Sequence, residues 1–232
     1  DVTGVQTCAL PIYQIQVSSS AQESALATNK VLRNTYALLS MTLIFSAITA
    51  TMAIASNAAP VNWIIQLVVL FGTLFALQKF RNSALSIPLV FFFTGFLGYT
   101  AGPIVNFYLG MANGGDIVMT ALSMTGITFL GLSAYAISSR KDFSFMGGFL
   151  MIGLILVIIA SLANIFFAIP ALSLAISAVG VLVFSGFILY DTSRMVNGGE
   201  TNYVMMTVSL YLNIYNLFMM LLHLTGALSG DD

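Results

Sequence analysis

The best candidates for chemistry in this chain stand where its last two long apolar runs meet. Asp191 ends the first of these runs in the motif ILYDTS, Arg194 follows three residues later, and Glu200 lies in the segment NGGETNY. A carboxylate at the end of a membrane-length apolar run is unfavourable unless it is paired, hydrated or protonated, so it indicates a functional site. We expect Asp191 and Arg194 to pair if one helix continues through both residues, because side chains three apart face each other.

The run that follows this segment carries a polar stripe. Spacings of three and four place its members on one helical face, and they are Asn202, Met206, Ser209, Asn213, Asn216, Met220 and His223. Polar groups in hydrocarbon need hydrogen-bond partners, so this face must point into a helix bundle or a wet cavity. Two interpretations remain open: a plain hydrogen-bonded seam between helices, or a path for ions.

Asp191 also has two interpretations. It is either a solvated aspartate at a helix end, or a proton-sensitive latch that holds the last two helices together. The residues expected to form this latch or gate are Asp191, Arg194, Glu200, Ser209, Asn213 and Asn216.

Enzymatic chemistry lacks a complete set of residues. The chain has one histidine, His223, and one cysteine, Cys8, so it cannot form an H-E-x-x-H zinc site or a multi-cysteine site. No G-x-S-x-G motif occurs, and without an evident partner serine His223 is expected to be a packed polar residue near the outer water interface. An aspartyl protease needs two carboxylates that share a proton, whereas the position facing Asp191 is Asn213. We predict no enzyme, no metal and no cofactor.

The elements that must position these residues are membrane helices. Of the 232 residues, 59% are apolar and 6% are charged, whereas soluble domains carry about 25% charged residues. Runs of about 20 apolar residues are long enough to cross a bilayer. Seven are predicted, at about 34–56, 62–78, 84–109, 116–138, 144–167, 171–190 and 202–227. The chain is therefore predicted to be all-α, a polytopic membrane protein with seven transmembrane helices and the striped last helix at the centre.

The basic residues predict the orientation. All seven precede the first span or lie after spans two, four and six, and they are Lys30, Arg33, Lys79, Arg81, Arg140, Lys141 and Arg194. By the positive-inside rule that side is cytoplasmic, which places the N-terminus inside and the C-terminus in the periplasm. A net charge of −1 without a basic block predicts no nucleic-acid partner.

The start of the chain differs from the rest. Residues 1–12 lack an initiator Met and follow no later pattern, so we expect them not to be native. Residues 13–29 are polar and rich in Ser, Ala and Gln, which is typical of a mobile tail. The chain is thus divided into a polar cytosolic tail, 1–29, and a membrane domain, 30–232.

Small residues and a proline add local expectations for the third span. The Gly98-x-x-x-Gly102 spacing predicts tight packing within the monomer rather than a dimer face. Pro103 predicts a kink or a break. The last span crosses the membrane or is re-entrant.

Several motifs resemble the Bax inhibitor-1 family of membrane proteins. The carriers of this resemblance are ILYDTS at 188–193 and SLYLNIYNLF at 209–218. Four more look like the bacterial YccA branch of the family: KVLRNTY at 30–36, FTGFLGYTAGPI at 93–104, RKDFSFMGG at 140–148 and NGGETNY at 197–203. The similarity runs from about residue 17 to the end. It implies a bacterial inner-membrane protein in which three helical hairpins surround a central last helix.

The resemblance also implies a function. YccA-like proteins are substrates and modulators of FtsH, the membrane-anchored ATP-dependent protease, so we expect a protein that binds and restrains FtsH. The alternative is a pH-sensitive calcium or proton leak gated near Asp191, because some bacterial relatives gate calcium with two aspartates on spans six and seven. Here the second position is Asn213, and residues 62–78 lack the arginine that those relatives use as counter-charge. The expected partners are the lipid bilayer, FtsH and, for the alternative, Ca²⁺.

Overall fold

The computed structural model describes residues 10–229 and folds them into helices alone. These are α1 (Leu10–Ala55), α2 (Trp63–Phe80), α3 (Ser86–Leu109), α4 (Gly114–Ser139), α5 (Met146–Phe167), α6 (Pro170–Val196) and α7 (Tyr203–Ser229). Each contains a span that is long and apolar enough to cross a membrane, in α1 from Lys30 to Ala55 and in α7 over its whole length. The predicted all-α, seven-span fold is confirmed.

Local sequence signals set the helix ends around the candidate site. Pro170 occupies the first turn of α6, where its missing N–H is not needed. The Asn202 side-chain oxygen accepts hydrogen bonds from the N–H groups of Val204 and Met205, at 3.1 and 3.0 Å, and so caps the start of α7. Pro170 thus starts α6 at its end remote from Asp191, and Asn202 starts α7 directly after the segment that carries Glu200.

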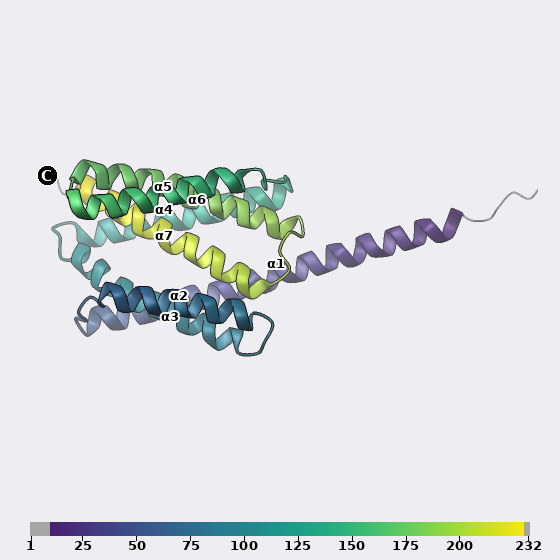
Figure 1. The fold of residues 1–232 in the computed structure, drawn as a ribbon, viewed down its shortest axis with the longest axis horizontal. Helices are drawn as coiled ribbons and strands as arrows, with labels where there is room; N and C mark the ends of the chain where they lie inside the picture. Colours follow the sequence, from purple (N-terminus) through teal and green to yellow (C-terminus); the bar gives the residue numbers. More distant parts are fainter. Residues whose placement is uncertain (1–9, 230–232) are drawn as a thin grey trace, which may run out of the picture.

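Helix α7 lies between two groups of helices (Figure 1). α1, α2 and α3 lie on one side of it, and α4, α5 and α6 lie on the other. α7 packs mainly on α1, α3, α4 and α6, whereas α2 packs on α3 and α5 packs on α6 at the periphery. Within the 18-residue apolar stretch that qualifies each helix as a membrane span, 56% of the residues are buried in α7, against 11% in α2 and in α5. The central position of the last helix is thus confirmed, with four helices rather than six as its main surroundings.

Helix α1 is longer than the predicted first span. It continues from Ala55 back to Leu10 and extends out of the bundle (Figure 1), so residues 13–29 are helical where a mobile tail was predicted. The stretch AQESALA at 21–27 consists mostly of good helix formers, and extending an existing helix avoids a new nucleation step. The part of α1 that is apolar enough to span a membrane begins at Lys30, within this continuous helix. Of the segment 1–12 expected not to be native, residues 1–9 lie outside the described residues.

The α1–α3 interface depends on the small residues of α3. A Cβ atom at Gly98 would collide with the Ser46 carbonyl oxygen, and one at Gly102 would lie 2.5 Å from Ala53 Cβ. The Gly-x-x-x-Gly face therefore packs against α1 of the same chain, as predicted. α3 continues unbroken through Pro103 to Leu109, so the alternative of a break is wrong. Prolines are tolerated within membrane helices where neighbouring groups satisfy the freed backbone.

The loops after α2, α4 and α6 gather at one end of the bundle (Figure 1). We call this the basic end and define it by loops 81–85, 140–145 and 197–202 with the start of the α1 span at Lys30. All seven basic residues lie at or beside it. The charges predicted that the loops after the second, fourth and sixth spans lie on one side of the membrane, and the helices are arranged in this way.

Candidate functional site

Asp191 lies near the end of α6 and faces α7. Its side chain is 3% exposed. One carboxylate oxygen, Oδ2, accepts hydrogen bonds from Ser209 Oγ at 2.5 Å and from Asn213 Nδ2 at 2.8 Å. Because Ser209 and Asn213 lie one turn apart on α7, two successive turns of that helix bind the same oxygen. The interpretation of Asp191 as a solvated helix-end residue is therefore wrong.

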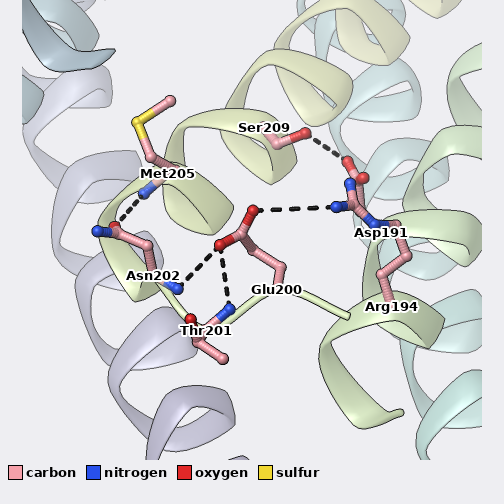
Figure 2. A network of polar contacts seen from close by, with 7 residues as sticks. All are labelled: Asp191, Arg194, Glu200, Thr201, Asn202, Met205 and Ser209. Carbon is pink, nitrogen blue, oxygen red and sulfur yellow. Dashed lines mark hydrogen bonds and ion pairs between the residues drawn. The ribbon is translucent and has the colours of Figure 1, made fainter. Parts of the chain in front are cut away.

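Arg194 and Glu200 form a loose ion pair beside this contact (Figure 2). Arg194 Nη2 lies 3.9 Å from Glu200 Oε2, and the guanidinium lies over the Tyr190 ring, 5.5 Å from its centroid. Glu200 Oε1 accepts hydrogen bonds from the backbone N–H groups of Thr201 and Asn202, both at 3.0 Å. No ion pair within 4.0 Å joins Asp191 and Arg194, so that predicted pair is wrong. The loop after α6 supplies Glu200 as the partner of Arg194 instead.

The other members of the stripe have separate partners. Asn216 donates from Nδ2 to the Leu212 carbonyl of its own helix, at 2.7 Å, and does not bind Asp191. Asn202 donates to the Arg81 carbonyl at 3.1 Å and to Asn82 Oδ1 at 2.9 Å, in the loop between α2 and α3. The stripe therefore joins α7 to several elements rather than to α6 alone.

His223 has a partner that sequence reasoning missed. Its Nδ1 lies 3.0 Å from Ser177 Oγ of α6. Ser177 precedes Asp191 by the same fourteen residues by which His223 follows Ser209. In two antiparallel helices, that equal spacing places both pairs on one interface, and it is the signal that could have identified Ser177. The sequence did not make this partner serine evident, because only the packing of α6 on α7 brings the two residues together.

A cavity of about 670 Å³ lies between α5, α6 and α7. It brings together five of the six residues predicted for the latch, which are Asp191, Arg194, Ser209, Asn213 and Asn216. Glu200 is not part of its lining and acts on the site through Arg194. The candidate site is thus a polar patch on the wall of a largely apolar cavity.

The end of α6 also holds the loop between α4 and α5. Ser193 Oγ donates to the Lys141 carbonyl at 2.9 Å and accepts from the Phe143 N–H at 3.0 Å. Asn197 Nδ2 donates to the same Lys141 carbonyl at 3.3 Å. In this loop, hydrogen bonds from Ser144 lower the pKa of the fully exposed Asp142 carboxyl. The α6–α7 segment therefore joins the other two loops of the basic end.

A second polar contact of α7 involves Tyr211, for which the sequence indicated no role. Its hydroxyl lies 2.6 Å from Ser46 Oγ of α1 and donates to the Thr94 carbonyl of α3 at 3.1 Å. The ring is 1% exposed and stacks on Tyr215, with centroids 6.2 Å apart. This contact joins three helices. The signal for it is the spacing of Tyr211 and Tyr215, one turn apart on α7.

Comparison with known proteins gives the family. The family described as "Inhibitor of apoptosis-promoting Bax1" matches residues 28–230. The chain is 50% identical over 218 residues to "Modulator of FtsH protease YccA" of Escherichia coli K12, covering 94% of this chain and 99% of that protein. It is 51% identical over 215 residues to an "Uncharacterized membrane protein" of Vibrio cholerae, covering 92% and 96% of the two chains. The seven-span fold, the motifs around Asp191 and these matches agree: the chain belongs to the Bax inhibitor-1 family of membrane proteins and is similar to its YccA members.

Proposed function

We propose that this chain binds the membrane-anchored protease FtsH in the bacterial inner membrane and restrains its action on membrane substrates. The observation that carries the proposal is the 50% identity to a protein named as a modulator of FtsH, over nearly the full length of both chains. The match covers the loops as well as the spans. A role that depends on the assembled protein is therefore favoured over one that depends on a single motif.

In this proposal the contact between Asp191, Ser209 and Asn213 acts as a latch. It fixes the end of α6 against α7, and the segment between these helices binds loops 81–85 and 140–145. The latch therefore holds the whole basic end in one arrangement. We place that end, and with it the N-terminus, in the cytoplasm because of its basic residues, and the C-terminus in the periplasm. The role is regulatory rather than enzymatic.

The calcium-leak alternative gains no support. Asn213 occupies the second position of the aspartate pair and donates a hydrogen bond to Asp191, so the two groups cannot share a titrating proton. The part of the chain that the structure describes contains no group of three or more His, Cys, Asp or Glu side chains placed to hold a metal ion.

Turnover of a membrane substrate of FtsH tests the proposal. Overproduction of the full chain is expected to lengthen the half-life of another FtsH substrate and to allow co-purification of FtsH with the chain. Asp191→Ala should weaken both effects at equal protein abundance, whereas Asp142→Asn, which removes an exposed charge but keeps an acceptor for the Ser144 N–H, should leave them unchanged. An unchanged substrate half-life on overproduction would refute the restraining role.

A further inference from the structure

The cavity between α5, α6 and α7 follows one face of α5. Its wall includes Gly147, Met151, Leu154, Ile158, Leu162 and Ile165, which recur at spacings of three and four and so share a helical face. At a rise of 1.5 Å per residue, this face extends over about 27 Å. The hydrocarbon core of a bilayer is about 30 Å thick. The cavity therefore runs beside α5 through most of the membrane.

The size and lining of the cavity indicate what can occupy it. The cavity, with a volume of about 670 Å³, is open along α5, where Met151, Leu162 and Ile165 of its wall are more than half exposed. The part away from Asp191 is lined by aliphatic side chains and Ser161 of α5, with Phe184 of α6 and Met220 of α7. An apolar groove of membrane length that is open to the surrounding lipid fits an acyl chain of that lipid.

The basic end of the cavity carries one cation and two acids. Arg194 lines the mouth and is about one-third exposed, and Glu200 beside it is 27% exposed. Their single contact of 3.9 Å leaves room for a better partner for each group. Asp191 is already bound by Ser209 and Asn213. An anionic headgroup would pair with Arg194 but would repel both acids, whereas a headgroup with both charges can satisfy Arg194 and Glu200 together.

We propose that this cavity is a binding site for a zwitterionic phospholipid with a primary ammonium group, of the phosphatidylethanolamine class, taken from the leaflet at the basic end. The phosphate binds the Arg194 guanidinium, the ammonium donates to Glu200, and one acyl chain lies along α5. The headgroup lies between Arg194 and Glu200 and so contacts the loop between α6 and α7, which carries Glu200. This site is independent of the proposed role toward FtsH.

Native mass spectrometry of the full chain in detergent tests the proposal, with phosphatidylethanolamine, phosphatidylcholine and phosphatidylglycerol of identical acyl chains. Phosphatidylethanolamine is expected to be retained about two- to fivefold more than phosphatidylcholine, whose quaternary ammonium cannot donate a hydrogen bond. Soluble phosphoethanolamine, which lacks the chains, should not bind measurably. Equal retention of the two zwitterionic lipids, tighter binding of phosphatidylglycerol, or equal binding of the free headgroup would each overturn the site.

Three variants locate the site. Glu200→Gln should abolish the preference for phosphatidylethanolamine while lipid binding persists, and Ser161→Phe should block all three lipids by filling the groove. The matched control is Asp142→Asn, an exposed acid at the same end, which should keep the preference. The proposal is wrong if Asp142→Asn reduces the preference as much as Glu200→Gln does, or if Ser161→Phe, shown to be folded by its thermal unfolding, retains lipid as the wild type does.

Discussion

Asp191 accepts two hydrogen bonds on one buried oxygen, and both donors belong to α7. A buried carboxylate without such donors would be strongly unfavourable in a membrane span. Ser209 and Asn213 are both donors that need no titration to hold it. At the scale of single residues, this arrangement ties the end of α6 to α7.

Removal of this carboxylate should loosen the α6–α7 pair. Asp191→Ala leaves the Ser209 hydroxyl and the Asn213 amide without their acceptor, so we expect a loss of about 1–3 kcal/mol in the free energy of unfolding. Equilibrium unfolding in mixed detergent micelles measures it. Asp142→Asn, at an exposed position, keeps an oxygen that can accept the Ser144 N–H and should change stability by less than about 0.5 kcal/mol. An unfolding free energy of Asp191→Ala equal to that of the wild type would show that the contact does not stabilise the fold.

Tyr211 is a second residue whose polar atom, the side-chain hydroxyl, joins helices. Tyr211→Phe keeps the packed ring but removes the contacts with Ser46 and Thr94, so we predict a loss of about 0.5–1.5 kcal/mol in the same unfolding measurement. Tyr135→Phe is the matched control because the Tyr135 side chain is exposed. Equal effects of the two substitutions would contradict a specific role for the Tyr211 hydroxyl.

At the scale of elements, the close approach of α1 and α3 depends on Gly98. Its backbone contacts the Ser46 carbonyl, and Ser46 is also the α1 partner of Tyr211. The small residues of α3 therefore set the distance at which the Tyr211 contact can form. Helix α7 thus contacts α6 through Ser209 and Asn213, and it contacts the α1–α3 pair through Tyr211.

A methyl group at Gly98 should force these helices apart. We expect Gly98→Ala to cost about 1–3 kcal/mol of unfolding free energy because the new atom overlaps backbone that cannot rotate away. Gly131→Ala is the control, since nothing lies within 4 Å of a Cβ atom at Gly131, and alanine there is neutral or slightly stabilising. Comparable losses in the two variants would mean that loss of a helical glycine, and not the collision, causes the effect.

At the scale of the whole molecule, the basic end is the largest asymmetry of the chain. Its loops carry Arg81, Arg140 and Lys141, and the other four basic residues lie on the adjoining helices. The loop between α6 and α7 binds the other two loops. By the positive-inside rule, this charge distribution predicts that the basic end faces the cytoplasm. Both the proposed FtsH role and the proposed lipid site place this end of the bundle on one defined side of the membrane.

Thiol labelling checks this orientation. In a Cys8→Ser background, a cysteine at Ala59, at the end opposite the basic end, should react with a membrane-impermeant reagent in cells whose inner membrane is intact. A cysteine at Ala84 of the basic end should react only after that membrane is permeabilised. The reverse pattern would invert the orientation, and labelling of both sites in intact cells would indicate a mixed one.

By itself, the sequence determined the number of spans, the helical class and the placing of the basic residues before the first span and after alternate spans. These follow from periodicity and from the need of each membrane segment to satisfy its own backbone hydrogen bonds. Only the tertiary structure decided the pairing of Arg194 with Glu200, of His223 with Ser177 and of Tyr211 with Ser46. Such contacts depend on how helices far apart in the sequence rotate and approach one another, and helical periodicity carries no information about that.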